Sequence, residues 1–367
     1  MTMEPTALII SIPRDIIFDI FSTLPVKSLM CFKSVSKFYN SLVCESVFVD
    51  IHQCRSRSRI KYIVRQRAKL YTIEAMEEGK VSPLHIDNFC EKLFYNYIMC
   101  VNGLFCCSMR NVDGVAICNP STKVVRSLPR LKDCPKIDCA EYFCSMGFDP
   151  EEKTYKVLMT INVFAKPTRN WVFTLGRDEE SWREIKGITD FVGKNAVCVS
   201  GVIYMLSYSK PNIFVLGFDV KSENFRMITL WNSLDEHMIG GSYNYNILKV
   251  NGKLAILDKK IWYLEGNFDL WILGKEEWEK HMIEIPAEHW TSPEFKRLTF
   301  CGTCDREILF TNKFASGQFI CLCYNVTEKR WRNFEIQGFS EQSSINEIYC
   351  YDESLFPVER ICNLFLN

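Results

Sequence analysis

The same succession of short strands and tight turns recurs about every 50 residues through most of this chain. Each repeat opens with a hairpin at a turn-forming pair of residues, and these pairs are Asn102-Gly103, Asp149-Pro150, Ser200-Gly201, Asn251-Gly252 and Cys304-Asp305. The fourth strand of each repeat carries an aromatic or branched residue at an equivalent position, namely Val125, Trp182, Phe225, Trp278 and Trp331. A small sheet of this kind cannot bury both faces by itself, so the repeats predict an all-β propeller in which every sheet is a blade.

The two ends of this repetitive region supply the parts of one more blade. Three short strand patterns precede the first full repeat, at 60–64, 70–75 and 81–86, and one more is left over at 345–351. Pairing the last strand with the first three would close the ring and remove exposed sheet edges, which otherwise invite aggregation. We therefore expect about six four-stranded blades, with five or seven as alternatives.

The first 50 residues follow the period of helices instead. Ile16, Ile20 and Leu24 recur at four-residue spacing, and Pro25 ends that helix. Two shorter amphipathic runs follow, at 26–35 and 38–43. Three helices in roughly 35 residues are too few to bury their apolar side chains, so this segment predicts a docking module for another protein. The alternative is a helical cap that packs on the C-terminal domain of the same chain.

The N-terminal segment resembles an F-box of the plant type. The matching residues are Ile12-Pro13, Asp15, Ile16, Ile20, the run from Leu24 to Leu29, Phe32-Lys33, the run from Val35 to Lys37, and Leu42. One departure is Phe38-Tyr39, where the family commonly has a Trp. The resemblance implies a three-helix module that docks on the Skp-type adaptor of a cullin-RING ubiquitin ligase. It implies adaptor contacts by Ile12, Pro13, Ile16, Ile20, Leu24, Pro25, Val26, Leu29, Phe32 and Val35.

The repeats resemble the kelch-like F-box-associated (type 3) β-propeller of plant F-box proteins. The resemblance is carried by short motifs, among them Asn102-Gly103-Leu104, the run from Asn119 to Thr122, the run from Gly147 to Pro150, Ser181-Trp182-Arg183 and Phe218-Asp219-Val220. The resulting fold class is α+β and multidomain. We expect an F-box at 8–52, a basic connector with the first propeller strand at 53–69, and the propeller domain at 60–367.

Together, the two resemblances imply the substrate-recognition subunit of an SCF-type cullin-RING E3 ubiquitin ligase. The F-box would bind the Skp adaptor, and the propeller would bind a target protein for ubiquitination and degradation. Such a subunit acts by proximity and needs neither a catalytic residue nor a cofactor. The alternatives are a non-degradative protein-interaction module and a glycan-binding propeller or propeller enzyme.

Target recognition is expected in loops that leave one face of the propeller. These loops are 130–140, 164–170, 187–194, 231–245, 286–295 and 313–318. Their aromatic residues Trp231, Tyr243, Tyr245 and Trp290 are the candidate anchors, because Trp and Tyr are enriched among the residues that dominate interface energies. The alternative for each is packing between blades.

The charge balance limits the classes of partner that the chain can bind, and the cysteine content bears on the cellular compartment. The 44 basic and 44 acidic residues cancel, which argues against electrostatic capture of nucleic acid or a membrane surface. The basic segment 54–69 is interpreted as a solvated connector and an edge strand, with a contact to an acidic partner or to nucleic acid as the alternative. No apolar run approaches the length of a membrane span.

The 18 cysteines occur without an export signal, so we expect reduced thiols in a cytoplasmic or nuclear protein. A zinc site is the less favoured alternative, since a second Cys-x-x-Cys pair is missing. Its candidate ligands are Cys301, Cys304, Cys321 and Cys323, together with Cys134, Cys139 and Cys144. No metal ligand is therefore assigned.

Overall fold

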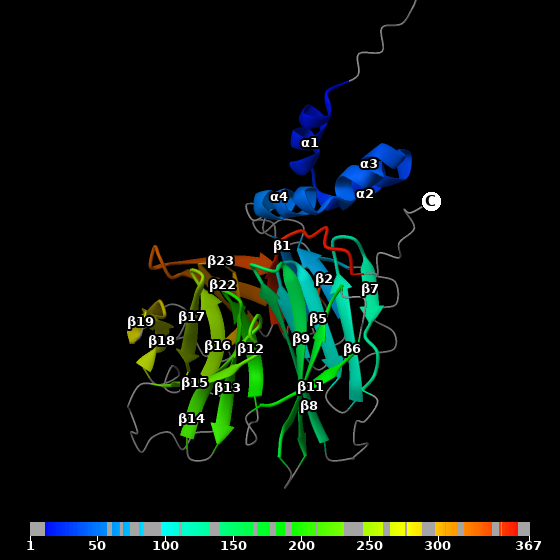
Figure 1. Ribbon diagram of the computed structural model, residues 1–367. Helices are drawn as coiled ribbons and strands as arrows, with labels where there is room; N and C mark the ends of the chain where they lie inside the picture. The colour runs from blue at the N-terminus through cyan, green and yellow to red at the C-terminus, as the bar shows by residue number, and fades with distance from the viewer. Residues whose placement is uncertain are drawn as a thin grey trace, which may run out of the picture.

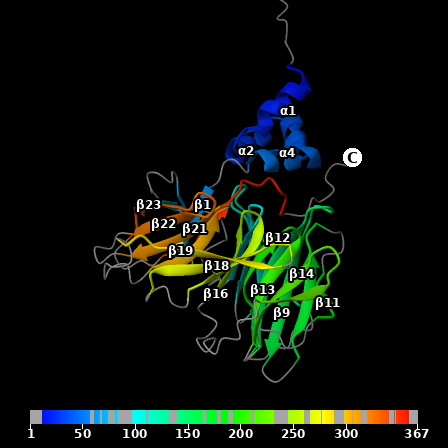
Figure 2. The same cartoon turned by 90° about the vertical axis from the view of Figure 1, so that its left-hand side faces the viewer.

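The computed structural model describes residues 12–56, 61–66, 69–73, 81–83, 97–109, 112–131, 140–163, 167–176, 181–187, 193–209, 212–230, 245–259, 265–275, 277–287, 298–304, 306–313, 319–339, 345 and 347–358. Four helices come first, followed by strands that form six four-stranded sheets around a common axis. The helices lie as a separate layer at one end of this ring (Figures 1 and 2). The prediction of an N-terminal helical module followed by a six-bladed propeller is therefore confirmed.

The helices are α1 (Arg14–Ser22), α2 (Val26–Val35), α3 (Lys37–Cys44) and α4 (Ser46–Ser56). Pro13 and Pro25 precede α1 and α2, where a missing N–H costs no intrahelical hydrogen bond. Ser36 begins α3 with a side-chain cap, since its Oγ accepts a hydrogen bond from the Phe38 backbone N–H at 3.2 Å.

The expectation of three helices was wrong by one, because α4 is helical as well. Its buried face consists of Phe48, His52 and Ser56, of which two are polar. The buried face of α4 is therefore not an apolar stripe. The helix also extends into the first residues of the segment expected to be a basic connector.

All strand pairs within the blades are antiparallel. From the axis outward, blade 1 consists of β24 (Glu347–Tyr351), β1 (Lys61–Gln66), β2 (Lys69–Ile73) and β3 (Val81–Pro83), and blade 2 of β4 (Tyr97–Val101), β5 (Leu104–Met109), β6 (Val112–Asn119) and β7 (Val124–Ser127). Blade 3 consists of β8 (Ala140–Asp149), β9 (Thr154–Val163), β10 (Arg169–Thr174) and β11 (Arg183–Ile185), and blade 4 of β12 (Gly193–Val199), β13 (Val202–Ser209), β14 (Asn212–Asp219) and β15 (Phe225–Thr229). Blade 5 consists of β16 (Tyr245–Val250), β17 (Lys253–Asp258), β18 (Asn267–Leu273) and β19 (Trp278–Glu284), and blade 6 of β20 (Thr299–Cys304), β21 (Glu307–Lys313), β22 (Phe319–Asn325) and β23 (Arg330–Ile336).

The ring closes as the sequence predicted, with one strand from the C-terminal side and three from the N-terminal side. In the pairing of β24 with β1, Tyr62 lies opposite Cys350 and Val64 opposite Ile348. On the other side of β24, the inner strand of blade 6 approaches so closely that a Cβ on Gly302 would lie 2.1 Å from the Ile348 carbonyl oxygen. Glycine is thus required at the seam between the last blade and the closing strand.

Three of the predicted hairpin turns have the same backbone conformation. At each, an Asn or Ser with φ near +50° precedes a glycine that also has positive φ. The pairs are Asn102-Gly103, Ser200-Gly201 and Asn251-Gly252. Positive φ at both central residues gives the turn whose twist matches that of the flanking strands, so these residues fix where each inner strand ends.

Neighbouring blades are joined by tryptophans at the positions singled out in the repeats. The Trp331 Nε1–H donates to the backbone carbonyl of Glu284 in the preceding blade at 2.8 Å. Trp278 makes the equivalent bond to Thr229 at 3.1 Å, and Trp182 to Pro129 at 2.6 Å. Each of these tryptophans therefore hydrogen-bonds to the preceding blade in addition to its packing contacts.

We expect Trp331→Phe to destabilise the propeller by about 0.5–1.5 kcal/mol, because it keeps a ring against Tyr324 but leaves the Glu284 carbonyl without its donor. The melting temperature should fall by roughly 1–4 °C. Phe225 occupies the equivalent position in blade 4, so a phenylalanine ring is compatible with the site. Unchanged melting would contradict a stabilising role for the indole N–H.

Candidate functional site

The four helices share a small apolar core. Its buried residues are Phe21, Val26, Leu29, Leu42, Val43 and Phe48, together with Leu355 from the other end of the chain. Val26 and Leu29 are fully buried there. These two residues are predicted adaptor contacts. In the free chain they lie inside the module, in the core that α2 shares with α1 and α3, and an adaptor contact by either stays a prediction.

A second set of apolar side chains is exposed. Ile16 and Ile20 on α1 are 47% and 50% exposed, and Ile12 and Val35 are exposed as well. Phe32 is partly exposed, with its ring packed against the Phe21 ring at 4.8 Å between centroids. Pro13 and Pro25 lie on the surface, and Leu24 is half-buried. Large exposed aliphatic side chains clustered on one small module indicate a surface that another protein covers. Figures 1 and 2 show α1 projecting away from the propeller, which leaves this surface accessible.

Two exposed apolar residues of the module were not among the predicted contacts. Phe38 is exposed at the start of α3, and Val47 is exposed in the first turn of α4. Phe38 occupies the position at which F-box sequences commonly have a Trp. This difference was the sequence feature that could have drawn attention to Phe38. Val47 lies in the unpredicted helix, so no signal pointed to it.

The helices cover the end of the propeller at which the inner hairpins turn. Lys153, in the turn between β8 and β9, forms an ion pair with Asp50 of α4. The inner strands begin at the opposite end of the propeller. In blade 5, for example, β16 starts at Tyr245, opposite Asp258, and ends beside the Asn251-Gly252 turn. The docking module and the described strand ends that flank the candidate recognition loops therefore lie at opposite ends of the ring.

Comparison with known families decides the relationship. The F-box domain model matches residues 9–50, and the model of the F-box associated beta propeller domain matches residues 59–357. The chain belongs to the F-box-associated propeller family. The matching model is that of an F-box associated beta propeller domain. The kelch-like character of the propeller stays a prediction.

Curated F-box proteins match this chain along almost their whole length. The F-box protein At5g65850 of Arabidopsis thaliana is 28% identical over 375 residues, which cover 97% of this chain and 92% of the relative. The F-box protein DOR of the same plant is 28% identical over 380 residues, which cover 95% of this chain and 94% of the relative.

Of the four predicted target anchors of this F-box protein, Trp231, Tyr243 and Trp290 lie outside the described residues. Tyr245 is buried and packs among apolar residues of blades 4 and 5, including Leu230 and Ile256. Its position is that of the packing alternative, because a buried side chain presents no surface to a target.

A cavity of about 740 Å³ lies along the axis of the propeller. All six inner strands contribute to it, and its lining mixes apolar residues such as Met99 and Ile348 with polar ones such as Asn246 and Lys249. Cys100 lies in this lining, and burial raises the pKa of its thiol to about 12, with the charge of Asp352 adding to the increase. The Cys100 thiol is therefore protonated at neutral pH and is a weak nucleophile.

The cysteines considered for zinc are packing residues in the structure. Cys301, Cys304, Cys321 and Cys323 are all buried in one apolar cluster of blades 1 and 6. Burial raises the pKa of Cys321. Within the part of the chain that the structure describes, no group of three or more His, Cys, Asp or Glu side chains is placed to hold a metal ion. The described helices also include none that is long and apolar enough to cross a membrane.

Proposed function

We propose that this protein is the substrate-recognition subunit of an SCF-type cullin-RING ubiquitin ligase. The F-box binds a Skp-type adaptor through the exposed apolar surface of α1 and α2, and the opposite end of the propeller binds a target protein for ubiquitination and degradation. The observation that carries the proposal is the exposure of Ile16 and Ile20 on α1, beside a closed core formed by other apolar residues of the module. Covering such side chains contributes roughly 1.5–3 kcal/mol each.

The subunit itself supplies no catalytic group in this proposal. Holding a target lysine near a ubiquitin-charged enzyme raises its effective concentration, which accelerates transfer without a nucleophile or base on this chain. The F-box and propeller domains of this chain, together with its similarity to F-box proteins, support such an adaptor role. We also place the protein in the cytosol or nucleus, where its many buried thiols stay reduced.

We expect the double substitution Ile16→Ala and Ile20→Ala to weaken capture of a Skp-type adaptor roughly 100-fold, since about 1.4 kcal/mol corresponds to a factor of ten. A binding titration with purified adaptor measures this. Melting should be unchanged, because both side chains already face solvent in the free protein. Undiminished capture would refute the assigned surface.

The matched control is Met227→Ala with Met282→Ala. These methionines are 57% and 58% exposed on outer strands of blades 4 and 5, so they offer comparable apolar area away from the F-box. Adaptor affinity should not change. Leu24 and Pro25 are less informative targets, because Pro25 precedes α2 and the Leu24 carbonyl is hydrogen-bonded to the His52 ring at 2.9 Å.

A further inference from the structure

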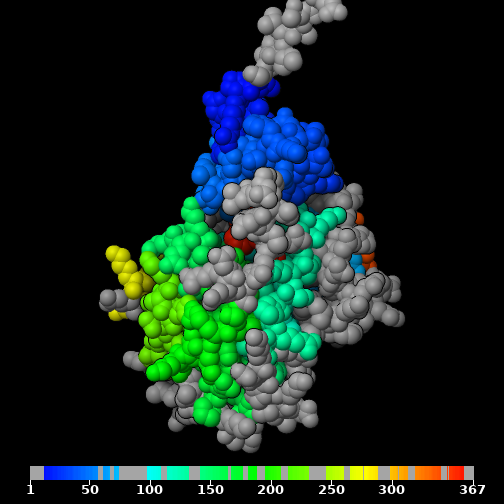
Figure 3. All heavy atoms as spheres, turned by 45° about the vertical axis from the view of Figure 1, so that its right-hand side comes forward, coloured from blue at the N-terminus to red at the C-terminus, as the bar shows by residue number. Residues whose placement is uncertain are grey.

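Residues 352–358 follow the closing strand and run between the F-box and the propeller, and we call them the strap (Figures 1 and 3). We infer that the strap fixes the orientation of the F-box on the propeller, with Glu353 and Leu355 as positioning residues. The orientation itself follows from contacts within this chain. Its value for ubiquitin transfer rests on the function proposed above.

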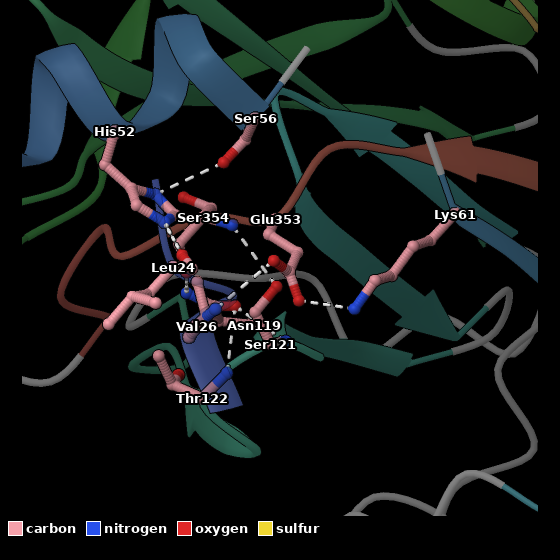
Figure 4. A network of polar contacts seen from close by, with 10 residues as sticks. All are labelled: Leu24, Val26, His52, Ser56, Lys61, Asn119, Ser121, Thr122, Glu353 and Ser354. Carbon is pink, nitrogen blue, oxygen red and sulfur yellow. Dashed lines mark hydrogen bonds and ion pairs between the residues drawn. The ribbon is translucent and has the colours of Figure 1, made fainter. Parts of the chain in front are cut away.

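Glu353 connects the strap to the start of α2. Its carboxylate accepts a hydrogen bond from the Val26 backbone N–H at 3.2 Å and forms an ion pair with Lys61 at the start of β1 (Figure 4). Pro25 precedes α2 and has no side-chain acceptor for the free N–H groups of the helix, so Glu353 supplies the cap from 327 residues away. The side chain is only 4% exposed, and such a buried charge is stable only with its partners in place.

Leu355 carries the strap into the F-box core. It packs with Val26, Leu29 and Phe48, and among the buried residues of that cluster it is the member that does not come from the helices. Burial of a leucine contributes roughly 1.5–3 kcal/mol, so the contact favours one position of the helices over all others.

The alternate residues of the strap are held by the propeller. The Asn119 side-chain amide donates to the carbonyl oxygens of Ser354 at 2.9 Å and Phe356 at 3.2 Å, and the Ser354 backbone N–H donates to Ser121 Oγ at 3.2 Å. Val358 is buried in the core of blades 2 and 3. Asn119 and Ser121 belong to a motif that carried the family resemblance, and in the structure both residues hydrogen-bond to the strap.

This alternation is what makes the strap an orienting element. Residues 353 and 355 bind the F-box, while 354, 356 and 358 bind blades 2 and 3, so neither side can rotate without breaking contacts to the other. The ion pair between Asp50 and Lys153 is exposed and contributes little by comparison. When the F-box is fixed, a bound adaptor lies at a single distance from the far end of the propeller and in a single orientation relative to it.

The direct test is the distribution of distances between a dye on α3 and a dye on blade 5. Exposed Ser41 and Glu279 are suitable label positions, with click-reactive residues because the chain has 18 cysteines. Single-molecule energy transfer on the full chain should give one narrow distribution. The double variant Glu353→Ala with Leu355→Ala should broaden it markedly while adaptor capture is retained. An unchanged narrow distribution would overturn the inference, and so would unfolding of the helices in this variant.

Two further variants keep the test sharp. Asn119→Asp retains the oxygen that accepts from the Ser121 N–H but loses the amide donor to the strap, so it should broaden the distribution without touching the F-box core. The matched control is Leu298→Ala, which removes a leucine as buried as Leu355, both 7% exposed, from the core of blades 5 and 6. The control should lower melting and keep the narrow distribution. Broadening by Leu298→Ala equal to that of the strap variants would contradict a specific role.

A second readout separates the strap from the proposed function. In a reconstituted ligase, the wild-type chain should be self-ubiquitinated on a few lysines, identified by mass spectrometry, and the double variant on a wider set. An unaltered lysine set in the double variant would overturn the positioning role. If no variant is ubiquitinated but the distance distributions differ as expected, the ligase proposal fails and the strap inference stands.

Discussion

Ending the chain before residue 345 should yield a protein that is insoluble or rapidly digested by proteases. This deletion removes β24, which pairs with β1 on one side and lies against Gly302 of β20 on the other. Blade 1 would then expose the unpaired edge of β1, and the apolar cluster that blades 1 and 6 share would lose Ile348. It also removes the cap on α2 and the Leu355 side chain from the F-box core. We therefore expect one deletion to disrupt the propeller and to release the F-box from its fixed orientation.

Two longer chains serve as controls, with solubility, thermal melting and limited proteolysis as the measurements. A chain that ends at Val358 keeps both the closing strand and the strap and should melt like the full chain. A chain that ends at Tyr351 keeps the ring but lacks the strap, so its propeller should fold while its F-box loses fixed orientation. A soluble chain that ends before residue 345 and melts cooperatively would show that β24 does not close the propeller.

Leu29→Ala should destabilise the F-box by about 2–5 kcal/mol, since Leu29 is fully buried in its core. For so small a module, this loss is large enough to unfold the helices while the propeller stays intact. Adaptor capture should then fail because the module is unfolded. Hydrogen exchange of the helices, measured beside the adaptor titration, distinguishes this outcome from loss of a surface contact.

Lys27→Ala is the control on the same helix, because Lys27 is exposed and should tolerate the change in both measurements. The contrast with Ile16 and Ile20 is informative as well, since their replacement should abolish tight binding and leave hydrogen exchange unchanged. If Leu29→Ala abolished capture with the helices still protected, Leu29 would be a direct adaptor contact, as the sequence had predicted.

The propeller could be predicted because its determinants are local in sequence. Turn pairs such as Asn251-Gly252 and the repeated Trp331 position mark each blade within about 50 residues. The closing strand was also predictable. The sequence has an unpaired strand pattern at its C-terminal side and a blade with three strands at its N-terminal side, and pairing the two completes the blade. The six blades and their closure are accordingly confirmed.

The sequence was less informative where a residue's role depends on distant partners. A short amphipathic helix with apolar residues on more than one stripe does not reveal which stripe faces its own core, so Val26 and Leu29 could not be told apart from Ile16 and Ile20. The fourth helix has a partly polar buried face. The strap has no periodic sequence pattern, and Glu353 lies 327 residues from its hydrogen-bond partner Val26. The local sequence therefore does not predict this contact.

The strap also sets an order of events during protein synthesis. Val26 leaves the ribosome 327 residues before Glu353, so a growing chain carries α2 without its cap and a helical core without Leu355. Both groups arrive only after the last closing strand, β24, has been made. The F-box is thus translated before the propeller but acquires its fixed orientation only after the closing strand of the propeller has been synthesised.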